Sequence, residues 1–152
     1  MKLLCVETSS RQGSLAIFTA SDSNDSLTLL TEASWEKKST HSDVITLMLV
    51  QALKEAGLQL NELTHIGLGL GPGSFTGLRV GINLAKTLAY SFNLPCLAIN
   101  SLRVLAEPAL SSHTTVMAAM PAIQNQFYVA CFKRQSDKTE EILERCSLDE
   151  KT

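Results

Sequence analysis

The order of apolar and polar residues predicts strands at the start of the chain. Two apolar runs, at 2–10 and 13–20, are joined by the short glycine-containing turn 11–13, which is typical of a β-hairpin. A third apolar run at 27–33 follows a polar turn at 21–25. Together, the three runs predict an antiparallel meander.

The next segment changes to a helical period. Residues 42–56 place apolar side chains three and four positions apart, which predicts an amphipathic helix. Ser39 or Thr40 is the candidate N-cap, and Gly57 stands where the residue after the helix is expected.

A strand–helix–strand alternation follows. Residues 65–70 predict a buried strand and residues 94–99 another strand, and residues 74–92 between them predict a helix. Because helical crossovers join parallel strands, these segments should add parallel strands to the meander. The sequence therefore predicts an α/β fold with a mixed sheet flanked by helices.

The end of the chain repeats its beginning. Residues 102–110 predict a short helix, and after a polar linker a second hairpin is expected at 115–120 and 127–132. The charged tail predicts at most one further strand, around Ile142.

The length of 152 residues suits one domain and part of another. We expect an N-terminal domain at 1–110 and the start of a truncated second domain at 111–152. Hydrophobic residues make up 45% of the chain and charged residues 18%, which is enough for a packed core.

Composition also limits the function classes. No apolar run approaches the roughly 20 residues of a membrane helix, and the N-terminus lacks the apolar segment of a signal peptide, so we expect a cytoplasmic protein without membrane contact. The four cysteines lie far apart, which favours reduced, structural thiols. The net charge of -2 gives no general attraction to nucleic acid.

The most informative segment is G-L-G-P-G-S-F-T-G-L-R-V-G at 69–81, a glycine-rich loop that leaves a strand and opens a helix. Backbone N–H groups at such a helix start can bind phosphate. The loop nevertheless lacks the P-loop pattern and breaks the G-x-G-x-x-G pattern. The candidate nucleotide-binding residues are Glu7, Thr8, Ser9, Gly71, Gly73, Ser74 and Thr76.

Small side chains recur every four residues in the helix 74–92 and form a ridge along which backbones can pack closely. The ridge could face the chain's own sheet or a partner. The helix 42–56 is apolar over about half its circumference, more than one interface requires. We favour a protein partner, with candidate interface residues Val44, Ile45, Met48, Leu49, Ala52, Gly77, Leu78, Gly81, Ile82, Ala85 and Ala89.

The opening L-C-V-E-T-S-S and the string G-P-G-S-F-T-G-L-R-V-G make the chain resemble the TsaB (YeaZ) family. The resemblance extends to about Glu107. It implies the fold of the actin-like, Hsp70 and sugar-kinase superfamily, which is ribonuclease H-like, and similarity to the glycoprotease-like TsaD proteins. In that fold a second domain repeats the first, and we expect this chain to carry only its beginning.

The resemblance also implies a role in tRNA modification, the placing of threonylcarbamoyl on the adenosine beside the anticodon. The chain is then expected to be a non-catalytic, dimerising scaffold that binds a TsaD-like catalytic paralogue. A TsaE-like ATPase would join the complex, and tRNA would be met only through it. ATP use is expected in the partners, so no cofactor is expected here.

Differences from the catalytic relatives favour this non-catalytic role. Their H-x-x-x-H metal motif falls on Ser101 and Leu105, neither of which can replace an imidazole. Glu7 stands where kinases of the superfamily have the aspartate that holds the nucleotide's metal. The three histidines lack ligand spacing, so we expect no metal and no catalytic residue. The alternative is a nucleotide-binding enzyme of the same superfamily, either ATPase or kinase-like.

Overall fold

The computed structural model describes residues 1–21, 26–36, 41–124, 126–135 and 138–149. The candidate N-caps Ser39 and Thr40 lie outside these residues. The elements in chain order are β1 (Lys2–Glu7), β2 (Gln12–Thr19), β3 (Thr28–Glu36), α1 (His41–Glu55), η1 (Leu60–Glu62), β4 (His65–Gly69), α2 (Phe75–Phe92), β5 (Cys96–Ile99), α3 (Ser101–Leu110), β6 (Thr115–Pro121), β7 (Gln126–Gln135) and β8 (Lys138–Asp149).

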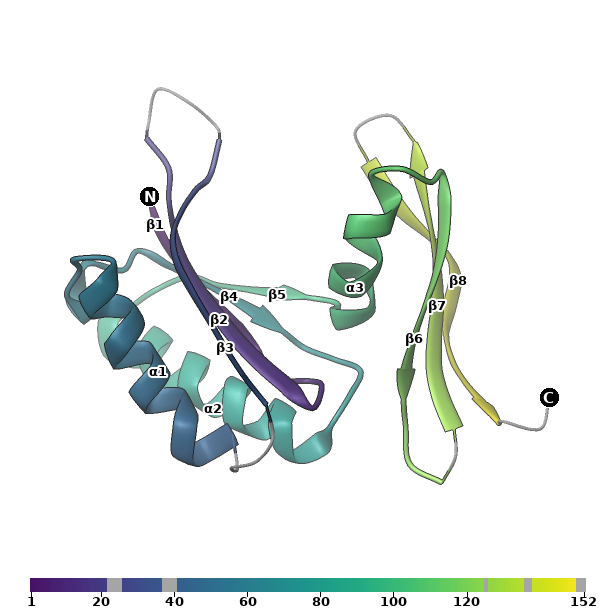
Figure 1. Cartoon of the computed structure of the whole chain (residues 1–152), viewed down its shortest axis with the longest axis horizontal. Coiled ribbons are helices and arrows are strands. Elements are labelled where there is room, and N and C mark those ends of the chain that lie inside the picture. The colour runs from purple at the N-terminus through teal and green to yellow at the C-terminus, as the bar shows by residue number, and fades with distance from the viewer. Residues whose placement is uncertain (22–25, 37–40, 125, 136–137, 150–152) are drawn as a thin grey trace.

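The first unit is a five-stranded mixed sheet in the order β3-β2-β1-β4-β5 (Figure 1). β1 pairs antiparallel with β2, and β2 with β3, which confirms the predicted meander. β4 pairs in parallel with both β1 and β5, with α1 and α2 in the connections. The expected mixed α/β sheet is therefore confirmed.

α1 and α2 lie side by side on one face of this sheet and bury its apolar side chains (Figure 1). In β1, Leu4 and Val6 are buried, whereas Cys5 and Glu7 point to the other face and are only partly buried. Burial of each large apolar side chain contributes about 1.5–3 kcal/mol. The core consists of Leu4, Val6, Leu15, Ile17, Trp35, Ile45, Leu49, Ala52, Leu53, Leu63, Ile66, Leu68, Ala85 and Leu88.

The opposite face of the sheet is largely open. No helix of the described part packs across it, because α3 reaches only its edge, where Val104 and Ile99 line a common groove. This leaves one side of β1, β2 and β4 without a second layer.

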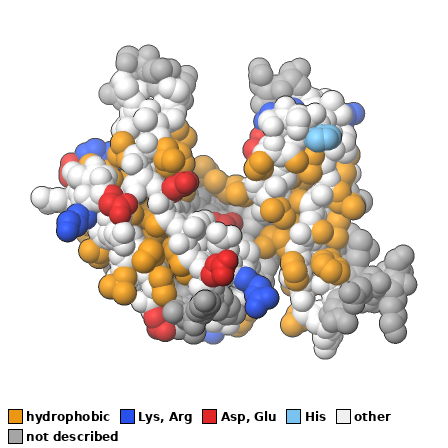
Figure 2. Space-filling model, viewed as in Figure 1, with side chains coloured by type: hydrophobic (Ala, Val, Ile, Leu, Met, Phe, Trp, Pro, Cys, Tyr) orange, Lys and Arg blue, Asp and Glu red, His pale blue; other side chains and the backbone are white. Residues whose placement is uncertain are grey.

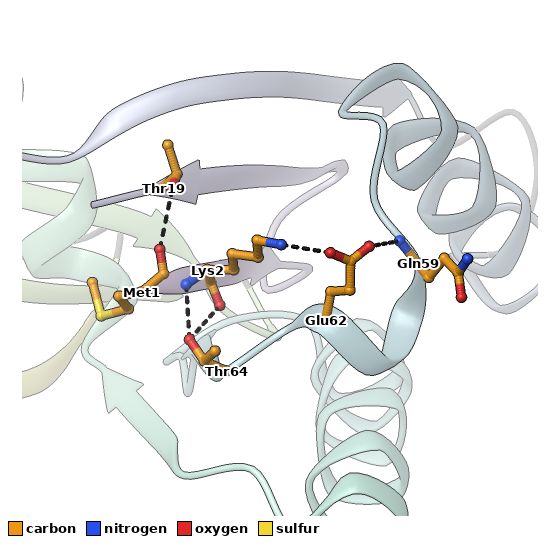
Figure 3. A network of polar contacts seen from close by, with 6 residues as sticks. All are labelled: Met1, Lys2, Thr19, Gln59, Glu62 and Thr64. Atoms are coloured by element: carbon orange, nitrogen blue, oxygen red, sulfur yellow. Dashed lines mark hydrogen bonds and ion pairs between the residues drawn. The ribbon is translucent and has the colours of Figure 1, made fainter. Parts of the chain in front are cut away.

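A polar network fixes the start of β1 beside the segment that leads into β4 (Figure 3). Lys2 Nζ lies 2.7 Å from Glu62 Oε1, and the other carboxylate oxygen of Glu62 accepts from the Gln59 N–H at 2.8 Å. The Lys2 N–H donates to Thr64 Oγ1 at 2.8 Å. The hydrogen bond from Lys2, followed by that from Gln59, lowers the pKa of the Glu62 carboxyl. These contacts help to set the parallel register of β1 and β4.

The helix ends follow the sequence signals. Ser74 caps α2, since its hydroxyl accepts from the Gly77 N–H at 3.3 Å, and Asn93 ends the helix in the left-handed conformation. Gly57 follows α1 with a φ of +66°, as expected for a residue that closes a helix. None of the described helices has the length and apolar composition needed to cross a membrane.

The second unit is a three-stranded antiparallel sheet, β6-β7-β8, with α3 packed on it (Figure 1). The predicted second hairpin is present, and the strand expected around Ile142 spans the twelve residues of β8. The sequence assigns 102–110 to the first domain, but α3 packs on the second sheet, so the two hydrophobic clusters divide near Asn100. The second cluster consists of Leu102, Ala106, Leu110, Ala118, Met120, Ala130 and Phe132.

Candidate functional site

The carboxylate of Glu7 joins three segments that are distant in the sequence. Glu7 Oε1 accepts from the Ser9 N–H at 2.7 Å, and Oε2 accepts from the Ser101 hydroxyl at 2.7 Å. Ser101 Oγ in turn accepts from the Gly71 N–H at 3.0 Å, and the Ser101 N–H donates to the Gly71 carbonyl at 2.9 Å. The end of β1, the glycine-rich loop and the first residue of α3 therefore meet at one carboxylate.

The glycine-rich loop packs closely against the turn that follows β1. The Ser74 N–H donates to the Ser9 carbonyl at 2.6 Å. A Cβ at Gly73 would overlap the backbone of Ser9, and Gly71 has a φ of +83° that favours glycine. These glycines are needed for close approach within the chain, which is a structural reason for the motif independent of any ligand.

The candidate nucleotide-binding residues divide into three groups. Glu7, Ser9, Gly71, Gly73 and Ser74 come together as described, whereas Thr76 is exposed. Thr8 is fully buried and its hydroxyl lies against α2, where a Cβ at Gly81 would overlap it. The Glu7 carboxylate occupies donors of the kind that would otherwise bind a phosphate oxygen, and its negative charge opposes an anion there.

The two positions on which the resemblance places the metal motif of the catalytic relatives, Ser101 and Leu105, have different surroundings here. Ser101 is 3% exposed and takes part in the Glu7 contacts, while the Leu105 side chain is 53% exposed. In the part of the chain that the structure describes, no three His, Cys, Asp or Glu side chains gather as metal ligands.

The ridge of small residues on α2 faces the chain's own sheet. Gly77, Gly81 and Ala85 are buried, and a Cβ at Gly81 would meet both Thr8 and Leu68. Of the two readings of this ridge, the structure supports close packing within the chain and leaves these residues no free surface for a partner. Ala89, Leu78 and Ile82 are partly buried at its flanks.

The candidate residues on α1 are also directed mainly inward. Ile45, Leu49 and Ala52 belong to the core, and Val44 and Met48 pack against it. These residues are candidates because they are apolar, but the most buried of them already have partners on the sheet.

A different set of apolar side chains is exposed on these two helices. On α1, Leu47 and Val50 are 66% and 62% exposed, and on α2, Phe75 and Tyr90 are 74% and 93% exposed. The Arg79 guanidinium lies 5.5 Å from the centre of the Phe75 ring. We call this surface the outer helix face, which comprises Leu47, Val50, Phe75, Arg79, Lys86 and Tyr90.

Part of this surface could have been found from the sequence. On a helical wheel, Arg79, Lys86 and Tyr90 fall on the side of α2 opposite its small ridge, and Phe75 falls beside them. The most apolar stripe of a helix usually faces its own sheet. The signal for a partner surface is instead the pair of aromatic residues on the polar side of α2.

Comparisons with known proteins point to one group. Residues 32–148 match the family model for tRNA N6-adenosine threonylcarbamoyltransferase, TsaD. The chain is 36% identical over 103 residues to the tRNA threonylcarbamoyladenosine biosynthesis protein TsaB of Haemophilus influenzae, covering 66% of this chain and 44% of the relative. It is 29% identical over 139 residues to TsaB of Escherichia coli, covering 90% of this chain and 57% of the relative.

Solved structures agree with these matches. YeaZ from Pseudomonas aeruginosa superimposes with a TM-score of 0.83 at 27% identity, covering 97% of this chain and 67% of that one. The fold shared with YeaZ and the strand order β3-β2-β1-β4-β5 confirm the fold class expected from the sequence. The chain thus spans about half the length of the two curated relatives named here.

Proposed function

Because the chain belongs to the TsaB (YeaZ) family, we propose that it acts in the biosynthesis of threonylcarbamoyladenosine in tRNA as a non-catalytic subunit. In this role it binds a TsaD-like catalytic paralogue through the outer helix face. A TsaE-like ATPase completes the machinery, and tRNA is met through the complex. Without its partner, the chain forms a homodimer through the same face.

The observation that carries this proposal is the exposure of Phe75 and Tyr90 on α2. Aromatic side chains are costly to leave in water, and burying each in an interface is worth about 1.5–3 kcal/mol before the costs of association. Together with Leu47 and Val50 they supply the apolar contact area of a partner surface.

The charges on the outer helix face indicate which charge the partner surface should carry. Arg79 and Lys86 are both exposed on α2, and the stacking of Arg79 on Phe75 holds one cation beside an aromatic ring. A partner that presents carboxylates around an apolar centre would therefore be complementary to this face.

The non-catalytic role is supported by the contacts of Glu7 and Ser101. Their side chains hydrogen-bond to each other at 2.7 Å and to the backbone of Ser9 and Gly71. These groups hold the loop and α3 together, which is a structural task. The two positions that would carry metal-binding histidines, Ser101 and Leu105, offer no ligand of that kind.

Reconstitution of the tRNA modification tests the proposal. TsaD-like and TsaE-like proteins of the same organism, with ATP, tRNA and a source of the threonylcarbamoyl group, would be assayed with and without this chain. We expect modified tRNA only when the chain is present, and none from the chain in the absence of the TsaD-like protein. Modification by the chain without that protein would contradict the non-catalytic role, and equal modification without the chain would contradict its participation.

A further inference from the structure

The two units are joined by a short junction and not by a shared core. β5 ends at Ile99 and α3 begins at Ser101, so only Asn100 stands between them. The buried cluster of the first unit contains no residue of α3 or β6 to β8, and the cluster of the second unit contains none of β1 to β5. The buried apolar clusters therefore do not fix how the second unit is oriented against the first.

Open space beside the junction leads to the same conclusion. A hollow of about 500 Å³ has residues of β5 on one side and Phe132, Thr139 and Glu141 of the second sheet on the other. Figure 2 shows the surface hollowed between the two units. Because the two sheets do not pack on each other across this hollow, the orientation of the second unit depends on the contacts of the junction itself.

Three hydrogen bonds hold Ser101 at the junction. Its hydroxyl donates to Glu7 Oε2 at 2.7 Å and accepts from the Gly71 N–H at 3.0 Å, and its own N–H donates to the Gly71 carbonyl at 2.9 Å. Ser101 is 3% exposed, so water competes little for these bonds. Since Ser101 is the first residue of α3, the bonds attach the start of this helix to the first unit.

The Glu7 carboxylate links Ser101 to β1. A carboxylate has two acceptor oxygens, and here one accepts from the Ser9 N–H at 2.7 Å and the other from Ser101. Hydrogen bonds to an ionised acceptor are about twice as strong as those between neutral groups. The fold also leaves room for the carboxylate, because a Cβ at Gly69 would overlap it. Its negative charge lies beside the N-terminus of α3, where the helix dipole favours it.

The neighbouring residue of the junction is attached to the second unit. Asn100 Oδ1 accepts from the Leu102 N–H at 2.9 Å and so caps α3, while Asn100 Nδ2 donates to Glu141 Oε2 on β8 at 3.3 Å. The junction is thus bound to the first unit through Ser101 and to the second through Asn100. A rotation of the second unit away from the first requires that the contacts of Ser101 break.

We propose that Glu7 and Ser101 form a clamp that sets the orientation of the second unit relative to the first. The carboxylate on β1 holds the start of α3, and α3 determines where the second sheet lies because it packs on β6 and β7. Without the clamp, the second unit turns about Asn100 into the neighbouring hollow. The clamp does not depend on the partner proposed above, because all of its groups belong to this chain.

Residual dipolar couplings of the ¹⁵N-labelled whole chain measure this orientation directly. In the native chain, we expect the couplings of β1 to β5 and those of α3 and β6 to β8 to fit one alignment tensor. In Glu7→Ala and in Ser101→Ala, each unit should keep its own fold, but the couplings of the second unit should no longer fit the tensor of the first. Melting temperatures would show that both variants are folded, and either variant alone is sufficient for the test.

Two matched variants separate the clamp from a general loss of stability. Glu62→Ala removes a carboxylate that also accepts two hydrogen bonds, but within the first unit. Ser111→Ala removes a serine hydroxyl at the other end of α3. Both should retain the common tensor even where their melting temperature falls. The proposal is overturned if the native chain already needs two tensors, if Glu7→Ala and Ser101→Ala retain a common one, or if the two control variants lose it to the same extent.

Discussion

Thr8 and Gly81 show how closely α2 approaches the sheet. Thr8 is fully buried, and its hydroxyl has no hydrogen-bond partner among the described residues. A buried hydroxyl without a partner costs about 1–3 kcal/mol. Gly81 gives this hydroxyl the space that a larger residue would take. The glycine at position 81 of the small ridge is therefore explained by a facing residue within the chain.

A double-mutant cycle at these two positions tests this explanation. Gly81→Ala should lower the free energy of unfolding by about 1–3 kcal/mol, because the new methyl group overlaps Thr8 Oγ1. In a Thr8→Ala background the same substitution should cost at least about 1 kcal/mol less, because the overlapping atoms are gone. Urea denaturation measures all four chains. Equal costs in the two backgrounds would mean that Gly81 is required for another reason.

At the scale of elements, the sequence specifies which segments are helices better than it specifies which way they face. α1 has apolar residues over about half its circumference, so hydrophobicity alone does not separate the stripe that meets the sheet from Leu47 and Val50 outside. The packing of α3 on the second sheet is equally hidden, because its partners on β6 and β7 follow it in the chain. The orientation of α1 and the packing of α3 both depend on contacts between residues that are distant in the sequence.

The ion pair between Lys2 and Glu62 contributes to the pairing of β1 with β4 in a pH-dependent way. The pKa of Glu62 is lowered in the folded chain, so its stabilisation is fully present above the ordinary glutamate pKa and is lost as pH falls through the folded value. Glu62→Gln should lower the melting temperature slightly at pH 7, because the carboxylate is exposed and the pair is screened.

Calorimetric melting of the native chain and Glu62→Gln across acid pH provides the check. The difference between the two melting temperatures should shrink as the pH falls below about 4.5, the ordinary glutamate value. Lys2→Met should give the same trend, because it removes the other member of the pair. A difference that stays constant down to pH 2 would show that the charge of Glu62 has no part in stability.

For the whole molecule, the strand and helix order could be predicted because hairpin turns, apolar periods and caps are local signals. The contacts of Glu7 could not, because Ser101 lies 94 residues away in the sequence. The extent of β8 could not be predicted either, since its charged sequence K-T-E-E-I-L-E-R-C-S-L-D carries little strand pattern and its pairing with β7 decides its length. The hollow lined by β1 to β5 likewise exists only once strands from both ends of the first unit are side by side.

The outer helix face is the central claim about function, and its direct test is the affinity of the chain for the TsaD-like protein of the same organism. Titration calorimetry would compare the native chain with Phe75→Asp/Tyr90→Asp, and with Met117→Asp, an exposed apolar position on β6. We predict that the double substitution weakens binding at least about 100-fold with an unchanged melting temperature, and that Met117→Asp leaves the affinity intact. Native affinity in the double variant, or an equal loss in Met117→Asp, would contradict the account.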